Sequence, residues 1–382
     1  MKTKTSSAAE PEKETKKLKA FSMIELMLAM TILAAMLLMF VGVLDQTQKS
    51  WDYAQGQISQ FREARVAFDI MTKNLSQATL NAYYDMVDLE PPPDGDGVPE
   101  RFEITSELHF KVFNADELTV SGHKPGHALF FQAPLGVTGN RDYYILNNLL
   151  NARAYYVAFN SDREFRPPFL TQYDTPERLR YRLMEWIPPT ERNMIYVDGA
   201  KETDDPDFDP KNPKFNEWFR DASNITEFSR PLAENVVALI ISPREPVTDA
   251  LAAANPARAE RESFQRIAPK YEFDSEKPED PRFRHLLPPL VKVTMVAIDE
   301  TTAIRYEDSG GGGSSPYMQT HLNGKFESAL NYQTDLDDLM DAFHSDDERD
   351  GLEVRYKIFS TNIAIMGSKW SADPQKDSTG TP

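Results

Sequence analysis

The clearest pattern along the chain is a single uninterrupted apolar run near its start. Residues 1–20 are polar and rich in lysine, and the run then begins at Phe21 and ends at Leu44, with Glu25 as its only charged residue. The uncharged part after Glu25 is about 28 Å long as a helix, which is close to the ~30 Å hydrocarbon core of a bilayer. The pattern therefore predicts a transmembrane helix over residues 21–44.

The charges on either side of this helix predict its orientation. Lysine is the dominant charged residue before the run, whereas Asp45 and Asp52 follow it with only Lys49 between them. By the positive-inside rule, the N-terminus lies in the cytoplasm and the residues after the helix lie outside. The run is longer than the apolar region of a secretory signal, and no A-x-A-like site follows it, so we expect a retained single-pass anchor.

An amphipathic pattern follows the apolar run directly. Apolar residues recur every three or four positions, which is typical of a helix with one buried side. No proline interrupts residues 21–82, and the pattern predicts a long helix over this range. Two arrangements remain open: one continuous helix, or a short anchor followed by a separate core helix. The apolar positions are Trp51, Ala54, Ile58, Phe61, Ala64, Phe68, Met71, Leu75 and Ala78.

Beyond residue 82 the periodicity changes to that of short strands. Val291 and Val293 alternate with Lys292 and Thr294, which is the period of a half-buried strand. Residues 177–186 fit either a helix or a strand. Strands are predicted at residues 107–113, 128–132, 142–147, 152–160, 236–242, 290–299 and 356–366.

Proline, glycine and charge mark the loops around these strands. Loops or polar insertions are expected at residues 90–97, 204–216, 248–282 (with a surface helix at 249–261) and 309–315, and a disordered tail at 372–382. Apolar residues at helical spacing predict a short amphipathic helix at residues 331–343. The fold class is therefore α+β, with an antiparallel sheet in residues 83–371 packed on the C-terminal half of the long helix.

Composition excludes several classes of function. The chain has 382 residues, 42 Lys and Arg against 60 Asp and Glu, a net charge of −18 and no cysteine. This acidic balance argues against a nucleic-acid partner, because phosphate backbones are bound by clustered lysine and arginine. Without cysteine there is no disulfide, no thiolate catalysis and no cysteine-type zinc site.

The sequence contains no constellation that indicates an enzyme. There is no Gly-x-Ser-x-Gly, no phosphate-binding Gly-x-x-x-x-Gly-Lys and no His-Glu-x-x-His. His123 and His127 are four positions apart, but the intervening Lys-Pro-Gly rules out the regular helix that a metal pair would need. Acidic stretches at 94–97, 204–209 and 335–350 leave calcium open, although none has the order of an EF-hand. We therefore expect a non-enzymatic protein without a cofactor.

The residues around the start of the apolar run resemble the processing site of type IV prepilins and type II secretion pseudopilins. The stretch reads Lys-Ala-Phe-Ser-Met-Ile-Glu-Leu, and its Phe21 and Glu25 match the family's first and fifth mature residues. The resemblance implies cleavage of the leader 1–20 between Ala20 and Phe21 by a prepilin peptidase, followed by N-methylation of Phe21. Ala20 stands where the family usually has glycine.

The same resemblance implies a role for Glu25 in assembly. A carboxylate in an apolar run either reaches back to the lipid headgroups or pairs with a cation. In the pseudopilin family it pairs with the N-terminal amine of an adjacent subunit. The implied partners are other pseudopilins, the prepilin peptidase, the inner-membrane assembly platform and membrane lipid. The implied location is the inner membrane, with the C-terminal domain in the periplasm and, after assembly, in the pseudopilus.

The rest of the chain resembles the larger minor pseudopilins of the J type. This resemblance favours a strand at residues 177–186. The ending at residues 355–371, RYKIFSTNIAIMGSKWS, is similar to the "cassette protein C" group of pseudopilin-like proteins from verrucomicrobial-type bacteria. The implied function is that of a minor structural subunit in protein transport. Two alternatives stay open: a single-span periplasmic protein with binding or hydrolytic activity, and a major pilus subunit.

Overall fold

The computed structural model describes residues 22–368 apart from residues 88–100, 168, 171–174, 176, 194–221, 248–257, 259–260, 262, 265–266, 279–282, 310–318 and 351–353. The leader 1–20, Ala20, Phe21, the loops at 90–97 and 204–216, nearly all of 309–315 and the tail 372–382 lie outside the described residues. The chain forms two compact units, Met1–Ile58 and Ser59–Pro382. Each unit is described by itself.

Helix α1, Met23–Ser76, is a single element of 54 residues. The sequence left open one helix or two, and the structure has one. It ends at Ser76, so the predicted end at residue 82 was too far along the chain. The reason is that the backbone leaves the helix to contact its neighbours: the amide of Thr79 donates to the carbonyl of Gln132 at 2.9 Å, and the amide of Met366 donates to that of Ser76 at 3.0 Å.

Three of the predicted strands form one antiparallel sheet in the order β11-β10-β8. They are β8 (Val236–Arg244), β10 (Leu290–Ile298) and β11 (Tyr356–Ala364). Val291 and Val293 are fully buried in the main core and Lys292 between them is less buried, as predicted. The strand is not half-buried as expected, however, because Thr294 and Val296 on its other face are buried too. The Cα register places Met295 opposite Phe359 and Thr294 opposite Ser360, so these two pairs face opposite sides of the sheet.

Helices cover both faces of this sheet. On one face the ring of Phe359 lies 5.8 Å from that of Phe68 in α1. On the other face the Thr294 hydroxyl lies 2.8 Å from that of Tyr332, the first residue of α9 (Tyr332–Asp350). The predicted helix at 331–343 is therefore confirmed and extends further. It covers the more polar face of β10, where the Lys292 ammonium lies 4.1 Å from the Tyr332 ring centroid.

A second antiparallel sheet has six strands in the order β7-β6-β5-β4-β3-β9. The ambiguous segment 177–186 is a strand, β6 (Leu179–Trp186). The two outer strands, β7 and β9, were not predicted: β7 carries Pro231, and β9 is only two residues long. Proline is compatible with an edge strand because no ladder amide is lost there. The remaining bounds are β3 Lys111–Asn114, β4 His127–Pro134, β5 Leu150–Ser161, β7 Ser229–Glu234 and β9 Phe273–Asp274.

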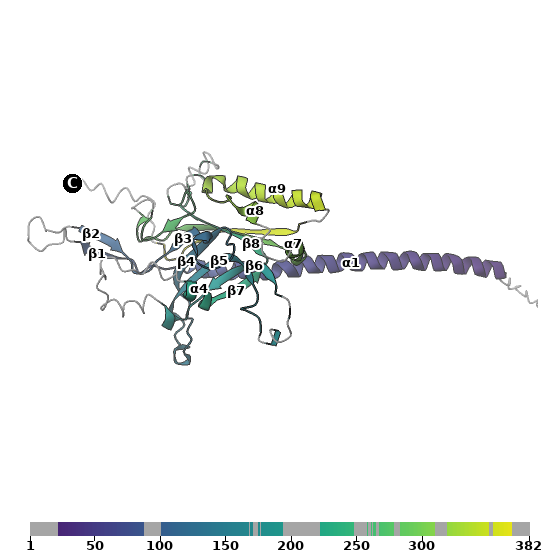
Figure 1. The fold of residues 1–382 in the computed structure, drawn as a ribbon, viewed down its shortest axis with the longest axis horizontal. Coiled ribbons are helices and arrows are strands. Elements are labelled where there is room, and N and C mark those ends of the chain that lie inside the picture. The colour runs from purple at the N-terminus through teal and green to yellow at the C-terminus, as the bar shows by residue number, and fades with distance from the viewer. Residues whose placement is uncertain are drawn as a thin grey trace, which may run out of the picture. The chain divides into compact units, whose positions relative to one another are not determined.

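Both faces of the six-stranded sheet are buried. Leu129 and Phe131 of β4 join the main core with α1 and the three-stranded sheet. Phe130, which points the other way, joins a second cluster with Trp186 and with Ile225 of α4 (Ala222–Phe228). Figure 1 shows α4 beside β7 and α9 on the side of the three-stranded sheet. The observed class is thus α+β, as predicted.

The other elements are short. Strands β1 (Tyr83–Val87) and β2 (Arg101–Thr105) form a separate antiparallel hairpin that the sequence analysis missed. Two short helices, α7 (Glu300–Ser309) and α8 (Gln319–Leu322), follow β10. Single 3₁₀ turns are η1 (Ala115–Glu117), η2 (Arg141–Tyr143), η3 (Thr190–Arg192) and η6 (Ala329–Asn331).

Two predicted strands need correction. Residues 142–147 are not a strand: the chain forms the 3₁₀ turn η2, in which the Asn140 side chain accepts from the Asp142 amide at 3.0 Å. Ile145 is 86% exposed, so the apolar residues here belong to a loop. The strand predicted at 107–113 starts only at Lys111, because the Asn81 side chain accepts the amides of the preceding turn.

The insertion expected at residues 248–282 is also corrected. Its described part contributes Phe264, Ile267, Tyr271 and Phe273 to the main core, and each is buried. The proline and charge content of this segment had suggested a polar surface insertion. Only Arg258 and Arg261 and their near neighbours are described from the expected surface helix.

Gly126 joins the two sheets at a parallel bridge to Leu239 of β8. Its φ is +81°, and a Cβ at this position would overlap the carbonyl oxygen of Leu239. Glycine is therefore required twice, for the left-handed backbone and for the close approach of the two chains.

Candidate functional site: the apolar N-terminal helix

Residues Met23–Gln48 of α1 form a 26-residue stretch that is long and apolar enough to cross a membrane. In the part of the chain that the structure describes, it is the one such stretch. Its side chains are exposed: Met23, Leu38 and Met39 are 88%, 75% and 77% accessible. Water contact with this much apolar surface is unfavourable by roughly 25 cal/mol per Å². The stretch therefore needs lipid or other apolar helices around it.

Ser22 and Glu25 form the first turn of α1. The Ser22 hydroxyl accepts the Glu25 amide at 3.2 Å, and its carbonyl accepts the Leu26 amide at the same distance. Ser22 is thus the N-cap, which satisfies one of the helix's free amides. A carboxylate in the first turn is favoured by the positive end of the helix dipole. Of the predicted processing and assembly residues, Glu25 is described, whereas Ala20 and Phe21 lie outside the described residues.

Small residues recur within the apolar stretch. Ala35 and Gly42 are seven positions apart, so they share one face of the helix. Apart from the helix's own nearby backbone, no atom of the described residues lies within 4 Å of the position that a Gly42 Cβ would occupy. Small side chains on a common face allow another apolar helix to approach closely.

The histidine pair considered from the sequence has other partners. His127 is fully buried; its Nε2 donates to the Phe326 carbonyl at 3.1 Å and its Nδ1 accepts the Ile241 amide at 3.0 Å. Burial lowers the pKa of His127 to about 4, so it is neutral at pH 7. The Nδ1 of His123 instead lies 2.9 Å from the Tyr181 hydroxyl. Both ring nitrogens of His127 are therefore used: one joins β4 to β8 at Ile241, and the other joins β4 to the segment at Phe326.

The acidic stretches considered for calcium are not brought together as ligands among the described residues. Residues 94–97 and 204–209 lie outside them. The stretch 335–350 lies on α9, where Asp335 accepts the Phe326 amide at 2.9 Å and Asp338 pairs with Lys325. Asp335, Asp337 and Asp338 of this stretch therefore each already have a separate partner.

Two hollows lie beside the part of α1 that belongs to the second unit. One has a volume of about 180 Å³ and is lined by Glu63, Glu234 and Glu300. Its carboxylates already have partners: Glu300 pairs with Arg178 at 2.5 Å, and Glu234 pairs with Arg182 at 3.1 Å. The other, of about 310 Å³, is a shallow apolar groove.

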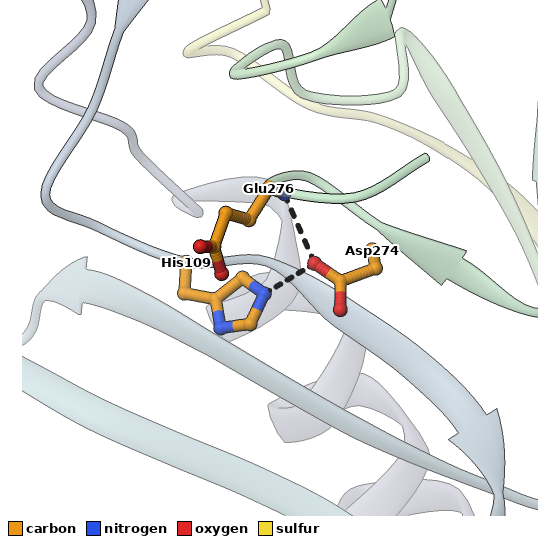
Figure 2. Close-up of side chains that lie close together, drawn as sticks. All are labelled: His109, Asp274 and Glu276. Carbon is orange, nitrogen blue, oxygen red and sulfur yellow. Dashed lines mark hydrogen bonds and ion pairs between the residues drawn. The ribbon is translucent and has the colours of Figure 1, made fainter. Parts of the chain in front are cut away.

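One cluster was missed by the sequence analysis. His109, Asp274 and Glu276 place three potential ligand atoms within 4.8 Å of one another (Figure 2). Burial by itself would raise the pKa of Asp274, but the hydrogen bond and charge of His109 and the ammonium of Lys111 hold it well below its usual range. His109 and Asp274 are 165 positions apart, so no local spacing could have revealed their contact.

Comparison of the chain with protein-family models, with curated proteins and with solved structures found no match in any of the three.

Proposed function

We propose that this protein is a minor pseudopilin-like subunit, a structural component of a type II secretion or type IV pilus-like assembly. The observation that carries the proposal is the first turn of α1. Glu25 stands there at the head of an exposed apolar helix, directly after the Ala20–Phe21 pair that resembles a prepilin cleavage site.

The helix supplies a physical reason for assembly. Before assembly, lipid covers the apolar stretch Met23–Gln48. After cleavage at Phe21, bundling with helices of other subunits keeps the same surface away from water. The carboxylate of Glu25 then pairs with the new amine of a neighbouring subunit, which sets the axial register of the two helices. A buried carboxylate with such a partner costs far less than an unpaired one.

The second unit fits a subunit that is carried by this helix. Residues 61–78 of the chain contribute Ala64, Phe68, Met71 and Leu75 to the core of the α+β domain. The same helix thus serves as membrane segment at one end and as core element at the other. A domain of this size suits a minor position, because it would be difficult to pack at every repeat of a thin fibre.

Single-cysteine cross-linking tests the proposal, because the chain has no cysteine of its own. A cysteine at Met36, which is 66% exposed, would be cross-linked in membranes of the native host. The expected result is cross-linked species that contain other pseudopilin-like proteins and that disappear in Glu25→Gln. The matched control is Glu10→Gln, which makes the same chemical change in the leader and should leave the cross-links unchanged.

The contrary result is equally specific. If Met36→Cys cross-links to no pilin-like protein, or if Glu25→Gln and Glu10→Gln behave alike, the assembly role is wrong. The chain would then be a single-span protein whose exterior domain acts by itself. Cross-links to copies of this chain alone would favour a major fibre subunit over a minor one.

A further inference from the structure

Three side chains from distant parts of the chain meet at the edge of the six-stranded sheet. His109 lies just before β3, Asp274 ends β9, and Glu276 lies two residues further on. The Nε2 of His109 lies 2.5 Å from an Asp274 carboxylate oxygen, and the nearest ligand atoms of all three residues lie within 4.8 Å of one another. Figure 2 shows both carboxylates turned toward the imidazole ring.

The backbone around this cluster is held on both sides. β3 and β9 pair through Lys111 and Asp274, and the Phe110 amide donates to the Ser275 hydroxyl at 2.9 Å. The His109 amide donates to the side-chain oxygen of Gln132 at 2.8 Å. His109 itself is 6% exposed. Ligands held in place in this way lose little entropy when they bind an ion.

The local charge favours a cation. Asp274 and Glu276 carry two carboxylates, and the Lys111 ammonium offsets one of them from 3.1 Å at the second Asp274 oxygen. Two carboxylates therefore lie beside one ammonium at the cluster. The other Asp274 oxygen faces His109 and also accepts the amides of Glu276 at 3.0 Å and Lys277 at 3.3 Å. A divalent ion is therefore attracted to the side of Asp274 that faces the imidazole.

The donor set selects the class of ion. One imidazole nitrogen with two carboxylate oxygens suits Zn²⁺, which binds both at about 2.0–2.2 Å and leaves a position for water. Ca²⁺ prefers six to eight oxygens and is a poorer match. Ligand atoms on one tetrahedral zinc are about 3.4 Å apart. The His109–Asp274 pair therefore has to open slightly, and Glu276 has to move inward, when the ion binds.

We propose that His109, Asp274 and Glu276 bind a divalent ion of the zinc class. The ion binds Nε2 of His109 on the side that faces Asp274, and the neutral ring then carries its one proton on Nδ1. The bound ion would link the residue before β3 to the end of β9 and to the segment after it. β9 pairs with β3 through only two residue pairs. An ion bound there therefore adds substantially to the few interactions that hold the segment after β9 in place.

Binding of Zn²⁺ to the tag-free full-length chain in detergent, after treatment with a chelator, tests this site. We expect saturable binding by calorimetry and a rise of several degrees in melting temperature at about a hundredfold excess over Kd. Glu276→Gln should weaken Zn²⁺ binding at least about tenfold. The neighbouring exposed Glu272→Gln is the matched control and should bind as the unaltered chain does.

Calcium serves as the comparison ion. Ca²⁺ at the same concentration should leave the melting temperature unchanged. The proposal is overturned if Zn²⁺ shows no saturable binding up to about 100 μM, or if Glu276→Gln and Glu272→Gln bind it equally. Because Glu276 is only half-buried and the replacement has the same shape, loss of folding does not confuse the result.

Discussion

At the scale of single residues, His127 makes the stability of the second unit depend on pH. Its ring is fully buried and its pKa is lowered from 6.5 to about 4. The unfolded chain takes up the proton near pH 6.5, whereas the folded chain takes it up only near pH 4. The unfolded state therefore binds more protons between these values, and stability falls as the pH drops through this window, by up to about 3 kcal/mol.

The substitution His127→Asn tests this effect. Asparagine retains an acceptor for the Ile241 amide but loses the donor to Phe326, so at pH 7 we expect a loss of about 1–3 kcal/mol. The decline in stability between pH 6.5 and pH 4 should become shallower, because the titrating group has gone. Denaturant unfolding at several pH values measures both. The exposed His344→Asn is the control, and equal slopes for the two variants would contradict the interpretation.

A comparison of two glycines distinguishes the cost of a left-handed backbone from the cost of a steric clash with a neighbouring strand. Gly126 and Gly324 both have positive φ, +81° and +73°, but a Cβ at Gly126 meets the Leu239 carbonyl while one at Gly324 meets nothing within 4 Å. We expect Gly324→Ala to cost about 1 kcal/mol and Gly126→Ala at least about 3 kcal/mol. Thermal or denaturant unfolding compares them. Similar losses would show that the bridge between the sheets yields easily.

At this scale the sequence revealed little of what was found. The sequence argued against a metal pair at His123 and His127, because Lys-Pro-Gly lies between them, but it did not reveal the partners of either ring. In the structure, His127 forms hydrogen bonds with Ile241 and Phe326, which are far away in the sequence. The partners of a buried polar residue such as His127 are determined by tertiary contacts. Those contacts depend on the order of the strands in the sheets.

At the scale of elements, the C-terminal part of α1 has one side buried in the core and one side exposed to water. Met71 is fully buried in the core, whereas Ile70 beside it is 38% exposed. We expect Met71→Ala to cost about 3 kcal/mol, because it removes buried surface and leaves a cavity. Ile70→Ala should cost less than about 1 kcal/mol, since much of its surface is already in water. Equal effects in denaturant unfolding would contradict the packing of α1 described above.

Periodicity predicted the elements that are buried on one or two faces. It identified β4, β5, β8, β10 and β11 as strands and α9 as a helix, because apolar spacing reflects burial directly. Periodicity failed where the spacing of apolar residues does not reflect which residues are buried. Residues 142–147 have apolar side chains in an exposed turn, and β7 and β9 are edge strands with a proline or only two residues.

At the scale of the whole chain, the N-terminal pattern predicted a helix able to cross a membrane, and the structure describes such a helix over Met23–Gln48. The division of the strands between two sheets could not be predicted. It depends on pairings such as that of β3 with β9, which bring Lys111 and Asp274 together across more than 160 positions. The cluster around His109 is a product of that pairing.

The central claim is that Phe21 becomes the N-terminus of an assembling subunit. The most direct test is mass spectrometry of the N-terminal peptide of the protein purified from its own membranes. We expect a chain that starts at an N-methylated Phe21. Ala20→Gly should give the same product, whereas the bulkier Ala20→Leu should retain residues 1–20. A peptide that spans an intact Ala20–Phe21 bond in the unaltered protein would contradict prepilin-type processing and, with it, the proposed assembly.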